Sequence, residues 1–283
     1  MKRLLKPIIE KLPFLASTYR FVRDYHPVTK RPEETSLGFK LIGDSSMLSG
    51  QYEPEETKLV KKLLPKVDVL INIGANIGYY TCMAMSLDTK VIAFEPMFSN
   101  LRYLFKNIEA NWNDSDVEIF PIALGNTIGI THIFGGSVEA SIIKGWGNTP
   151  EHYVSIVPIS TLDTVLGNRF NNSEQIFILV DIEGAEQYML EGATFFLSRS
   201  PKPIWMLEIL IEDHQPRGTT INPNLLATFD MFWENGYEAF IANSSLRLVG
   251  RNEIENMTRT GVNTLQWENL LFIEKNRKSY YLT

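Results

Sequence analysis

The chain has 283 residues, of which 44% are hydrophobic and 21% are charged, a composition that excludes a wholly disordered protein. Cys82 is the only cysteine, which excludes an internal disulfide and leads us to expect the reducing cytoplasm. Residues 1–31 hold eight basic and two acidic side chains, a net +6, and the whole chain is −6, which leaves −12 for the rest. A protein with so acidic a body is not expected to bind nucleic acid.

The first 50 residues are predicted to form a basic, helical N-terminal extension ahead of a domain at 51–283. No apolar run approaches about 18 residues, so the sequence predicts no transmembrane helix. Charged residues also interrupt the apolar start that would otherwise indicate a signal peptide. Two readings of residues 1–31 stay open: a helix packed on the domain, or a helix lying on a partner or on an anionic surface such as the inner face of a membrane.

The rest of the sequence alternates predicted helices and strands. A helix is expected at 54–64, where Pro54 suits the first turn and Pro65 ends it. Apolar, β-branched runs predict strands at 67–73, 90–95, 117–124, 176–182, 203–210, 237–242 and 268–274. Helices are expected at 77–87, 97–112, 185–197 and 223–235. This alternation is typical of a doubly wound, mostly parallel α/β sheet.

The section 125–170 interrupts the alternation. Its segments THIFGG (131–136), ASIIKG (140–145) and YVSIVPI (153–159) are predicted to be short β segments inserted between the third and fourth strands. Insertions at this edge of a sheet commonly shape a substrate pocket, although a plain excursion of the chain would give the same pattern.

Residues 72–78, NIGANIG, leave the first strand of this sheet and enter a helix. Ligands of open α/β sheets bind beyond the carboxyl ends of the strands. Gly74 and Gly78 allow sharp turns, and Asn76 tolerates a left-handed conformation. Glu95 ends the second strand 21 residues after Gly74, which suits a carboxylate that holds a ribose diol. The ribose could belong to a dinucleotide or to S-adenosylmethionine, and the dinucleotide motif G-x-G-x-x-G matches at only one of its three glycines.

The segments IGANIGYYT, AFEP and VDIEGAE, in this order, resemble the FkbM family of S-adenosylmethionine-dependent methyltransferases. The resemblance continues in STLDTVL (160–166), in LEI around Glu208 and in NLLFI (269–273), and covers about residues 50–275. It implies a class I methyltransferase fold, which is Rossmann-like, and methylation of a hydroxyl, often on a sugar or a polyketide. It also implies S-adenosylmethionine contacts from Asn72, Gly74, Ala75, Asn76, Gly78, Tyr79, Glu95, Pro96, Ala123 and Asp181.

Two positions depart from the family's pattern. Asn72 stands where the first motif usually has an acid, and Leu179 stands where the fourth-strand motif commonly has a lysine. Asn accepts hydrogen bonds, so we expect the first change to weaken cofactor binding without abolishing it. The second change is expected to alter the charge around Asp181.

Four residues are catalytic candidates: Asp181, Glu183, Glu208 and His214. Asp181 ends the fourth strand, and Glu208 lies on the neighbouring fifth strand. A sugar hydroxyl has a high pKa and benefits from a general base or a metal ion. Asp181, Glu208 and His214 are suitable ligand types, but the sequence does not show that they converge, and no metal is predicted. Asp181 and Glu183 could instead cap the helix that follows them.

These observations favour an O-methyltransferase that acts on a sugar, a glycolipid or another small hydroxyl-bearing acceptor. Two alternatives stay open. A nicotinamide-dependent oxidoreductase would use a similar sheet, and a non-catalytic cofactor-binding scaffold would suit the missing acid at Asn72. The sequence does not indicate an oligomeric state.

Overall fold

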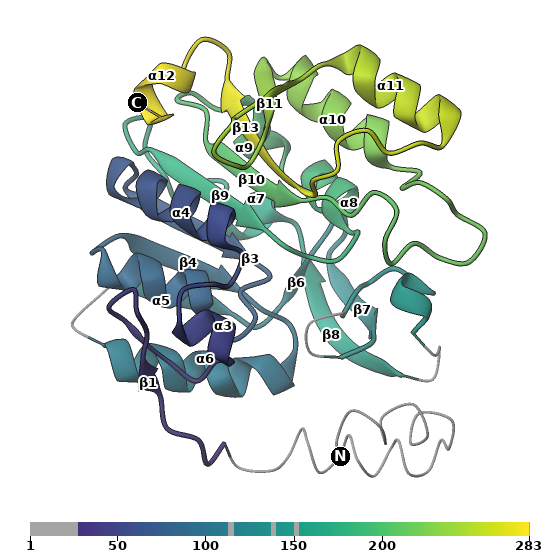
Figure 1. The fold of residues 1–283 in the computed structure, drawn as a ribbon. Coiled ribbons are helices and arrows are strands. Elements are labelled where there is room, and N and C mark those ends of the chain that lie inside the picture. The colour runs from purple at the N-terminus through teal and green to yellow at the C-terminus, as the bar shows by residue number, and fades with distance from the viewer. Residues whose placement is uncertain (1–27, 113–115, 137–139, 150–152, 283) are drawn as a thin grey trace.

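The computed structural model describes residues 28–112, 116–136, 140–149 and 153–282, and its centre is an eight-stranded sheet (Figure 1). The strands are ordered β12-β11-β13-β10-β9-β3-β4-β5 across the sheet. Their bounds are β3 Val69–Ile73, β4 Lys90–Phe94, β5 Val117–Phe120, β9 Ile176–Val180, β10 Ile204–Glu208, β11 Tyr237–Ile241, β12 Leu248–Val249 and β13 Asn269–Glu274. β3, β4, β5, β9 and β10 pair in parallel, whereas β13 is antiparallel to both of its neighbours. The mostly parallel sheet is therefore confirmed.

Helices cover both faces of this sheet, which is why every residue of β3 and β9 is buried. Successive side chains of a strand alternate between the faces, so Ile71 joins one core and Leu70 the other. The Leu70 face packs against α4 Pro54–Leu63, α5 Tyr79–Ser86, α6 Phe98–Asn111 and α12 Lys278–Leu282. The Ile71 face packs against α7 Leu162–Leu166, α8 Glu186–Glu191, α9 Thr194–Ser198, α10 Leu225–Glu234 and α11 Arg251–Thr260.

Two predicted elements are divided in the structure. The strand expected at 117–124 breaks at Pro121, which has no N–H to donate, into β5 and a short β6, Ala123–Leu124, that leaves the main sheet. The helix expected at 185–197 breaks at Gly192 into α8 and α9. A Cβ at Gly192 would lie 2.1 Å from the carbonyl oxygen of Gly125, so the insert and this turn are in close contact.

The insert forms its own three-stranded sheet, in the order β6-β8-β7, with β7 Gly129–Phe134 and β8 Val154–Ser160. Two of the three predicted β segments are thus strands. ASIIKG was wrongly predicted as a third, because 140–145 makes only a single bridge, between Ser141 and Phe134, before the 3-10 turn η3 Trp146–Asn148. The loop runs toward the carboxyl ends of the main strands instead, where its side chains meet the site described below.

Residues 28–50 contain β1 Glu33–Glu34, β2 Lys40–Leu41 and α3 Ser45–Leu48. Phe39 and Leu41 are fully buried among the residues of α5 and α6. The backbone N–H of Ile42 donates to Asn107 Oδ1 at 2.6 Å, which ties this segment to α6. The predictions made for residues 1–27 lie outside the described residues. Among the helices that are described, none combines the length and the hydropathy needed to span a membrane.

Candidate functional site

The turn between β3 and α5 brings the backbone against the end of β9. Gly74 has φ +83°, and a Cβ there would lie 1.8 Å from the carbonyl oxygen of Asp181. Asn76 has φ +51°, as its side chain type predicts, and its N–H points at Glu95. The glycine at position 74 is therefore required by the contact between the turn and β9.

Glu95 follows β4 and is held by three donors. Its Oε2 accepts the N–H of Asn76 at 2.8 Å, and its Oε1 accepts the N–H of Met97 at 2.8 Å and the amide of Asn100 at 3.3 Å. The side chain is 4% exposed, and burial raises its pKa to about 7, against the lowering effect of these hydrogen bonds. Oε2 accepts one described bond and so keeps acceptor capacity toward a ligand.

A pocket opens beside Glu95 at the carboxyl ends of β3, β4 and β9. Its lining includes seven predicted site residues: Gly74, Asn76, Glu95, Pro96, Ala123, Asp181 and Glu183. Apolar side chains of the insert and its flanks complete the wall, namely Ile122, Leu124, Ile133, Ala140 and Ile142. A nucleoside requires an apolar surface for its base and a hydrogen-bond acceptor for its ribose, and this pocket offers both, in the apolar wall and in Glu95. The residues present therefore fit the nucleoside part of S-adenosylmethionine.

Four other predicted contacts do not line this pocket. The amide of Asn72 is buried and donates to Thr81 Oγ1 at 3.0 Å, so it faces α5. Ala75 is 4% exposed, and Gly78 packs against Leu104, which leaves no room for a Cβ. Tyr79 turns toward α4, where its hydroxyl lies 3.3 Å from Thr57 Oγ1. These four residues shape the turn that carries Gly74 and Asn76.

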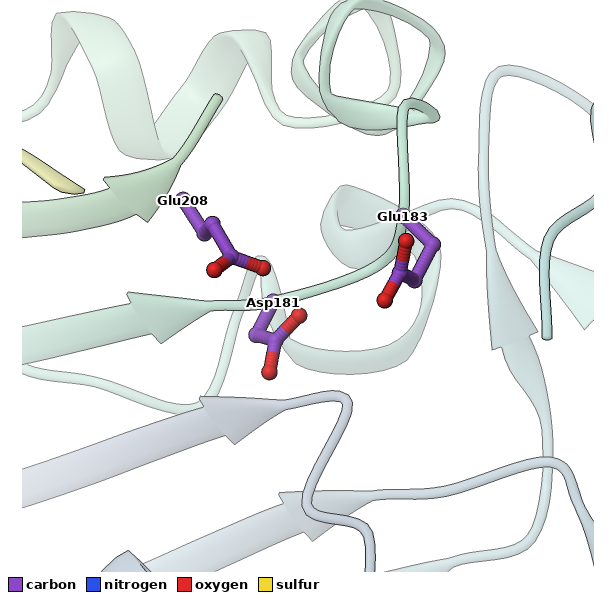
Figure 2. Close-up of side chains that lie close together, drawn as sticks. All are labelled: Asp181, Glu183 and Glu208. Atoms are coloured by element: carbon purple, nitrogen blue, oxygen red, sulfur yellow. The ribbon is translucent and has the colours of Figure 1, made fainter. Parts of the chain in front are cut away.

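Three carboxyl groups meet next to the pocket: Asp181 after β9, Glu183 on the loop behind it and Glu208 at the end of β10 (Figure 2). One oxygen from each lies within 4.8 Å of the others. Burial raises the pKa of Asp181, and a hydrogen bond from Glu208 lowers it in part. Burial and the charge of Asp181 raise the pKa of Glu208. Both shifts oppose ionisation of the two acids at the same time, and the hydrogen bond between them lowers the pKa of Asp181 while it raises that of Glu208.

Glu183 is placed by the insert. Trp146 Nε1 donates to Glu183 Oε2 at 2.8 Å, and His214 Nδ1 lies 3.2 Å from the same oxygen. Glu183 has φ +54°, an unfavourable backbone conformation that the surrounding contacts hold in place. The structure thus brings the carboxyl groups of Asp181, Glu183 and Glu208 together. His214 contacts Glu183 alone among these three acids. The trio that could hold a cation is the three acids, and the set of Asp181, Glu208 and His214 considered from sequence is replaced.

The expectation that Asp181 and Glu183 could cap the next helix is wrong. Ala185 is the N-cap of α8 and makes no side-chain bond to it. The N–H of Gly184 is instead accepted by Glu186 Oε1 at 2.9 Å. Glu186 was not singled out from sequence, although an acid in the first helical turn is a common signal for this role. Asp181 and Glu183 are left with their carboxylates facing the site.

The sequence analysis missed three residues that interact with one another or with the three acids: Tyr52, Glu53 and Tyr80. Tyr80 donates its hydroxyl to Glu53 Oε2 at 2.7 Å. The charge of Glu53 raises the pKa values of both Asp181 and Glu208, and Asp181 and Glu208 in turn raise that of Tyr52. Glu53 has φ +40° and stands just before α4. Nothing in the sequence links it to Asp181, because the two are brought together only by the packing of α4 on the sheet.

Comparison with known proteins identifies the family to which this chain belongs. The sequence pattern of the methyltransferase FkbM domain matches residues 72–239, more than half of the chain. No curated protein matches it. The match decides against the nicotinamide-dependent oxidoreductase.

Solved structures resemble the chain more weakly. A precorrin-6y C5,15-methyltransferase from Geobacter metallireducens has 12% identity and a TM-score of 0.39, with 70% of this chain and 78% of that chain covered. A 16S rRNA methyltransferase from T. thermophilus, in complex with AdoMet and guanosine, has 13% identity and a TM-score of 0.37, with 81% and 44% covered. TM-scores this low support no argument about function. The assignment of the chain to the methyltransferases therefore rests on the family match, and its fold on the strand order.

Proposed function

This chain belongs to the FkbM family of methyltransferases, and from that premise we propose that it methylates a hydroxyl group of a sugar or glycoconjugate. Its fold is the class I methyltransferase fold, and its cofactor is S-adenosylmethionine. The bound cofactor would supply a methyl group on a positively charged sulfur, which leaves as a neutral thioether. The observation that carries the proposal is the group of three carboxyl groups beside the nucleoside pocket.

The cofactor is proposed to lie with its ribose on Glu95 Oε2 and its base against the apolar wall near Ala123 and Ile142. Its sulfonium charge would then lie near Asp181, which lines the same pocket. Opposite charges attract strongly at a site from which water is largely excluded. This placement explains how a buried acid group is tolerated there.

Asp181 is proposed to receive the proton of the acceptor hydroxyl. Glu208 donates a hydrogen bond to it, which leaves Asp181 as the deprotonated member of the pair, with a pKa raised toward the range in which a general base works well. With the cofactor bound, the acceptor oxygen would take the methyl group as the neutral thioether is released, and Asp181 would take the proton of the hydroxyl. Trp146 and His214 hold Glu183, which is placed to accept a hydrogen bond from a neighbouring hydroxyl of the acceptor.

The test is incubation with methyl-labelled S-adenosylmethionine and separate pools of glycans, glycolipids, proteins and small metabolites. Label in a glycan or glycolipid, stable as an ether, is the expected result. Label only in proteins or in nitrogen-containing metabolites would overturn the proposal for a hydroxyl. Cofactor binding without transfer to any pool would favour the scaffold. A parallel reaction with EDTA establishes whether the three acids need a cation for their role.

A further inference from the structure

A second cavity, of about 300 Å³, opens where β13 begins. Because β13 runs antiparallel to β10, its first residue lies at the same edge of the sheet as the last residue of β10. The strand order β13-β10-β9-β3 then places Glu208 and Asp181 between this cavity and the nucleoside pocket. A molecule bound in the cavity would therefore reach the carboxyl groups from the side opposite the cofactor.

Asn269 connects the cavity to the three acids. It is the cross-strand partner of Glu208, so the two side chains lie next to each other on one face of the sheet. Its amide donates to Oε1 of Glu56 at 3.4 Å, and both residues line the cavity. Asp213, which also lines it, directly precedes His214 in the chain. The cavity thus adjoins the candidate site at two places.

The lining of this cavity is polar and carries no positive charge. Six of its side chains have an amide or a carboxyl group, and they are Asn263, Gln266, Asn269, Glu56, Asp213 and Glu268. The seventh is the half-buried Trp267. Among the residues that the structure describes, no lysine, arginine or histidine lines the cavity, so a phosphate or carboxylate group would be repelled there. An acyl chain is also unsuited to so polar a surface. An uncharged, polar ligand is favoured.

Several of these side chains are available to a ligand. Within the described part of the chain, no hydrogen bond uses the side chains of Asp213, Gln266 or Glu268. Burial raises the pKa of Glu268, and the charge of Asp213 raises it further, so the two acids lack a donor between them. A hydroxyl group donates to a carboxylate and accepts from an amide with the same oxygen. A ring with several neighbouring hydroxyl groups can use both kinds of side chain at once, and its C–H groups can pack on an indole.

We infer that this cavity binds an uncharged saccharide ring, whose hydroxyl groups form hydrogen bonds with Asp213, Gln266 and Glu268. That the ring belongs to the methyl acceptor rests on the proposed function, whereas the binding of a saccharide here does not. The acceptor would then approach Asp181 and Glu208 from β13, and the cofactor from β3 and β4. The substrate class that follows is a glycan whose ring at this position carries neither a phosphate nor a carboxylate group.

The experiment measures binding of the fluorescently labelled full chain, with S-adenosylhomocysteine, to an array of defined neutral saccharides and their uronic acid and phosphate counterparts. We expect binding to neutral saccharides and at least about tenfold weaker binding to the acidic ones. Asp213→Ala/Gln266→Gly removes two exposed side chains of the cavity, and glycine suits the φ of +52° at position 266. This variant should bind neutral saccharides at least about tenfold more weakly, because two hydrogen-bonding groups are lost.

The matched control is Glu234→Ala/Asn276→Gly. It changes an exposed acid and an exposed residue with φ +68°, and neither residue lines the cavity. The control should bind saccharides as the wild type does, and both variants should keep the wild-type affinity for S-adenosylhomocysteine, which shows that they are folded.

Three results would overturn the inference: no binding to any saccharide, equal binding to neutral and acidic counterparts, or wild-type binding by Asp213→Ala/Gln266→Gly. Binding only to peptides on the same array would also overturn it. The array involves no methyl transfer, so the two proposals can fail separately. A chain that labels a glycan but is indifferent to the cavity variant loses only this inference. A chain that binds saccharides through the cavity and labels none loses only the proposed function.

Discussion

At the scale of single residues, Glu95 holds two loops together while one of its oxygens stays open to a ligand. The N–H groups of Asn76 and Met97 belong to the β3–α5 turn and to the entrance of α6, and both donate to this carboxyl group. Two backbone donors would lose their partner if the acid were removed, so its role in binding and its role in stability cannot be separated by truncation to Ala.

We therefore predict a pH effect that Glu95→Gln removes. A ribose that donates hydrogen bonds needs the ionised carboxylate, and the pKa of Glu95 in the free protein is about 7. Affinity for S-adenosylhomocysteine should thus fall about tenfold per pH unit below 7 and level off above it. Glu95→Gln should bind more weakly and without this slope. Calorimetric titration over the pH range checks it, and an equal slope in both proteins would refute it.

Stability should change in the opposite direction with pH. The folded pKa of Glu95 is raised, so the folded chain retains the proton after the unfolded chain has lost it. Glu95 therefore lowers the free energy of unfolding progressively as pH rises from about 4.5 to about 7. The same Gln variant should lack this contribution.

Asp181 and Glu208 are predicted to respond differently to loss of charge. Asp181→Asn removes the proton acceptor, so turnover should fall by roughly 10²-fold. Glu208→Gln keeps a donor toward Asp181, as the protonated acid does, and should retain most of the turnover. Methyl transfer per folded molecule is the measurement, with melting temperatures as the control. If Glu208→Gln were as inactive as Asp181→Asn, the base would be Glu208.

At the scale of elements, the sequence correctly predicted the strands whose apolar pattern matches their burial in the folded chain. β3 and β9 are uninterrupted apolar runs, and the structure buries them from end to end. Where tertiary contacts decide, prediction failed: β6 leaves the sheet after Pro121, and the loop of Trp146 folds onto Glu183. No local pattern specifies that an indole N–H will meet a carboxylate 37 residues away.

The β3–α5 turn allows a matched test of backbone strain against lack of space. Gly74 and Gly38 have φ +83° and +92°, but a Cβ would meet the Asp181 carbonyl oxygen at the first and nothing within 4 Å at the second. Gly38→Ala should cost about 1 kcal/mol, the price of a left-handed residue. Gly74→Ala should lower the free energy of unfolding by about 3 kcal/mol or more, because β9 must move. Denaturant unfolding of both variants checks it, and equal losses would exclude the steric account.

At the scale of the whole molecule, the candidate site could be predicted to the extent that it follows from topology. Asp181 and Glu208 end neighbouring parallel strands, so their meeting follows from the strand order. Glu53 comes from a segment that precedes the sheet, and Trp146 from the insert. Both reach the site only through packing that the sequence does not express.

The cofactor should stabilise the chain as a whole. A ligand at 100 times its dissociation constant adds about 2.7 kcal/mol to the free energy of unfolding, which corresponds to roughly 5–10 °C for a domain of this size. S-adenosylhomocysteine should therefore raise the melting temperature by that amount, and NAD should not change it. A scanning calorimeter decides the matter, and equal shifts with the two ligands would contradict the pocket assignment.

The position of β13 determines when the protein can finish folding as it is synthesised. β13 follows β11 and β12 in the sequence but lies between β10 and β11 in the sheet. On the ribosome, β3, β4, β5, β9 and β10 can pair as they emerge, whereas β11 and β12 can pair only with each other until residues 269–274 are free. Throughout that interval β10 offers an open apolar edge to other nascent chains. We therefore expect this stage of synthesis to be the one at which aggregation competes most with folding.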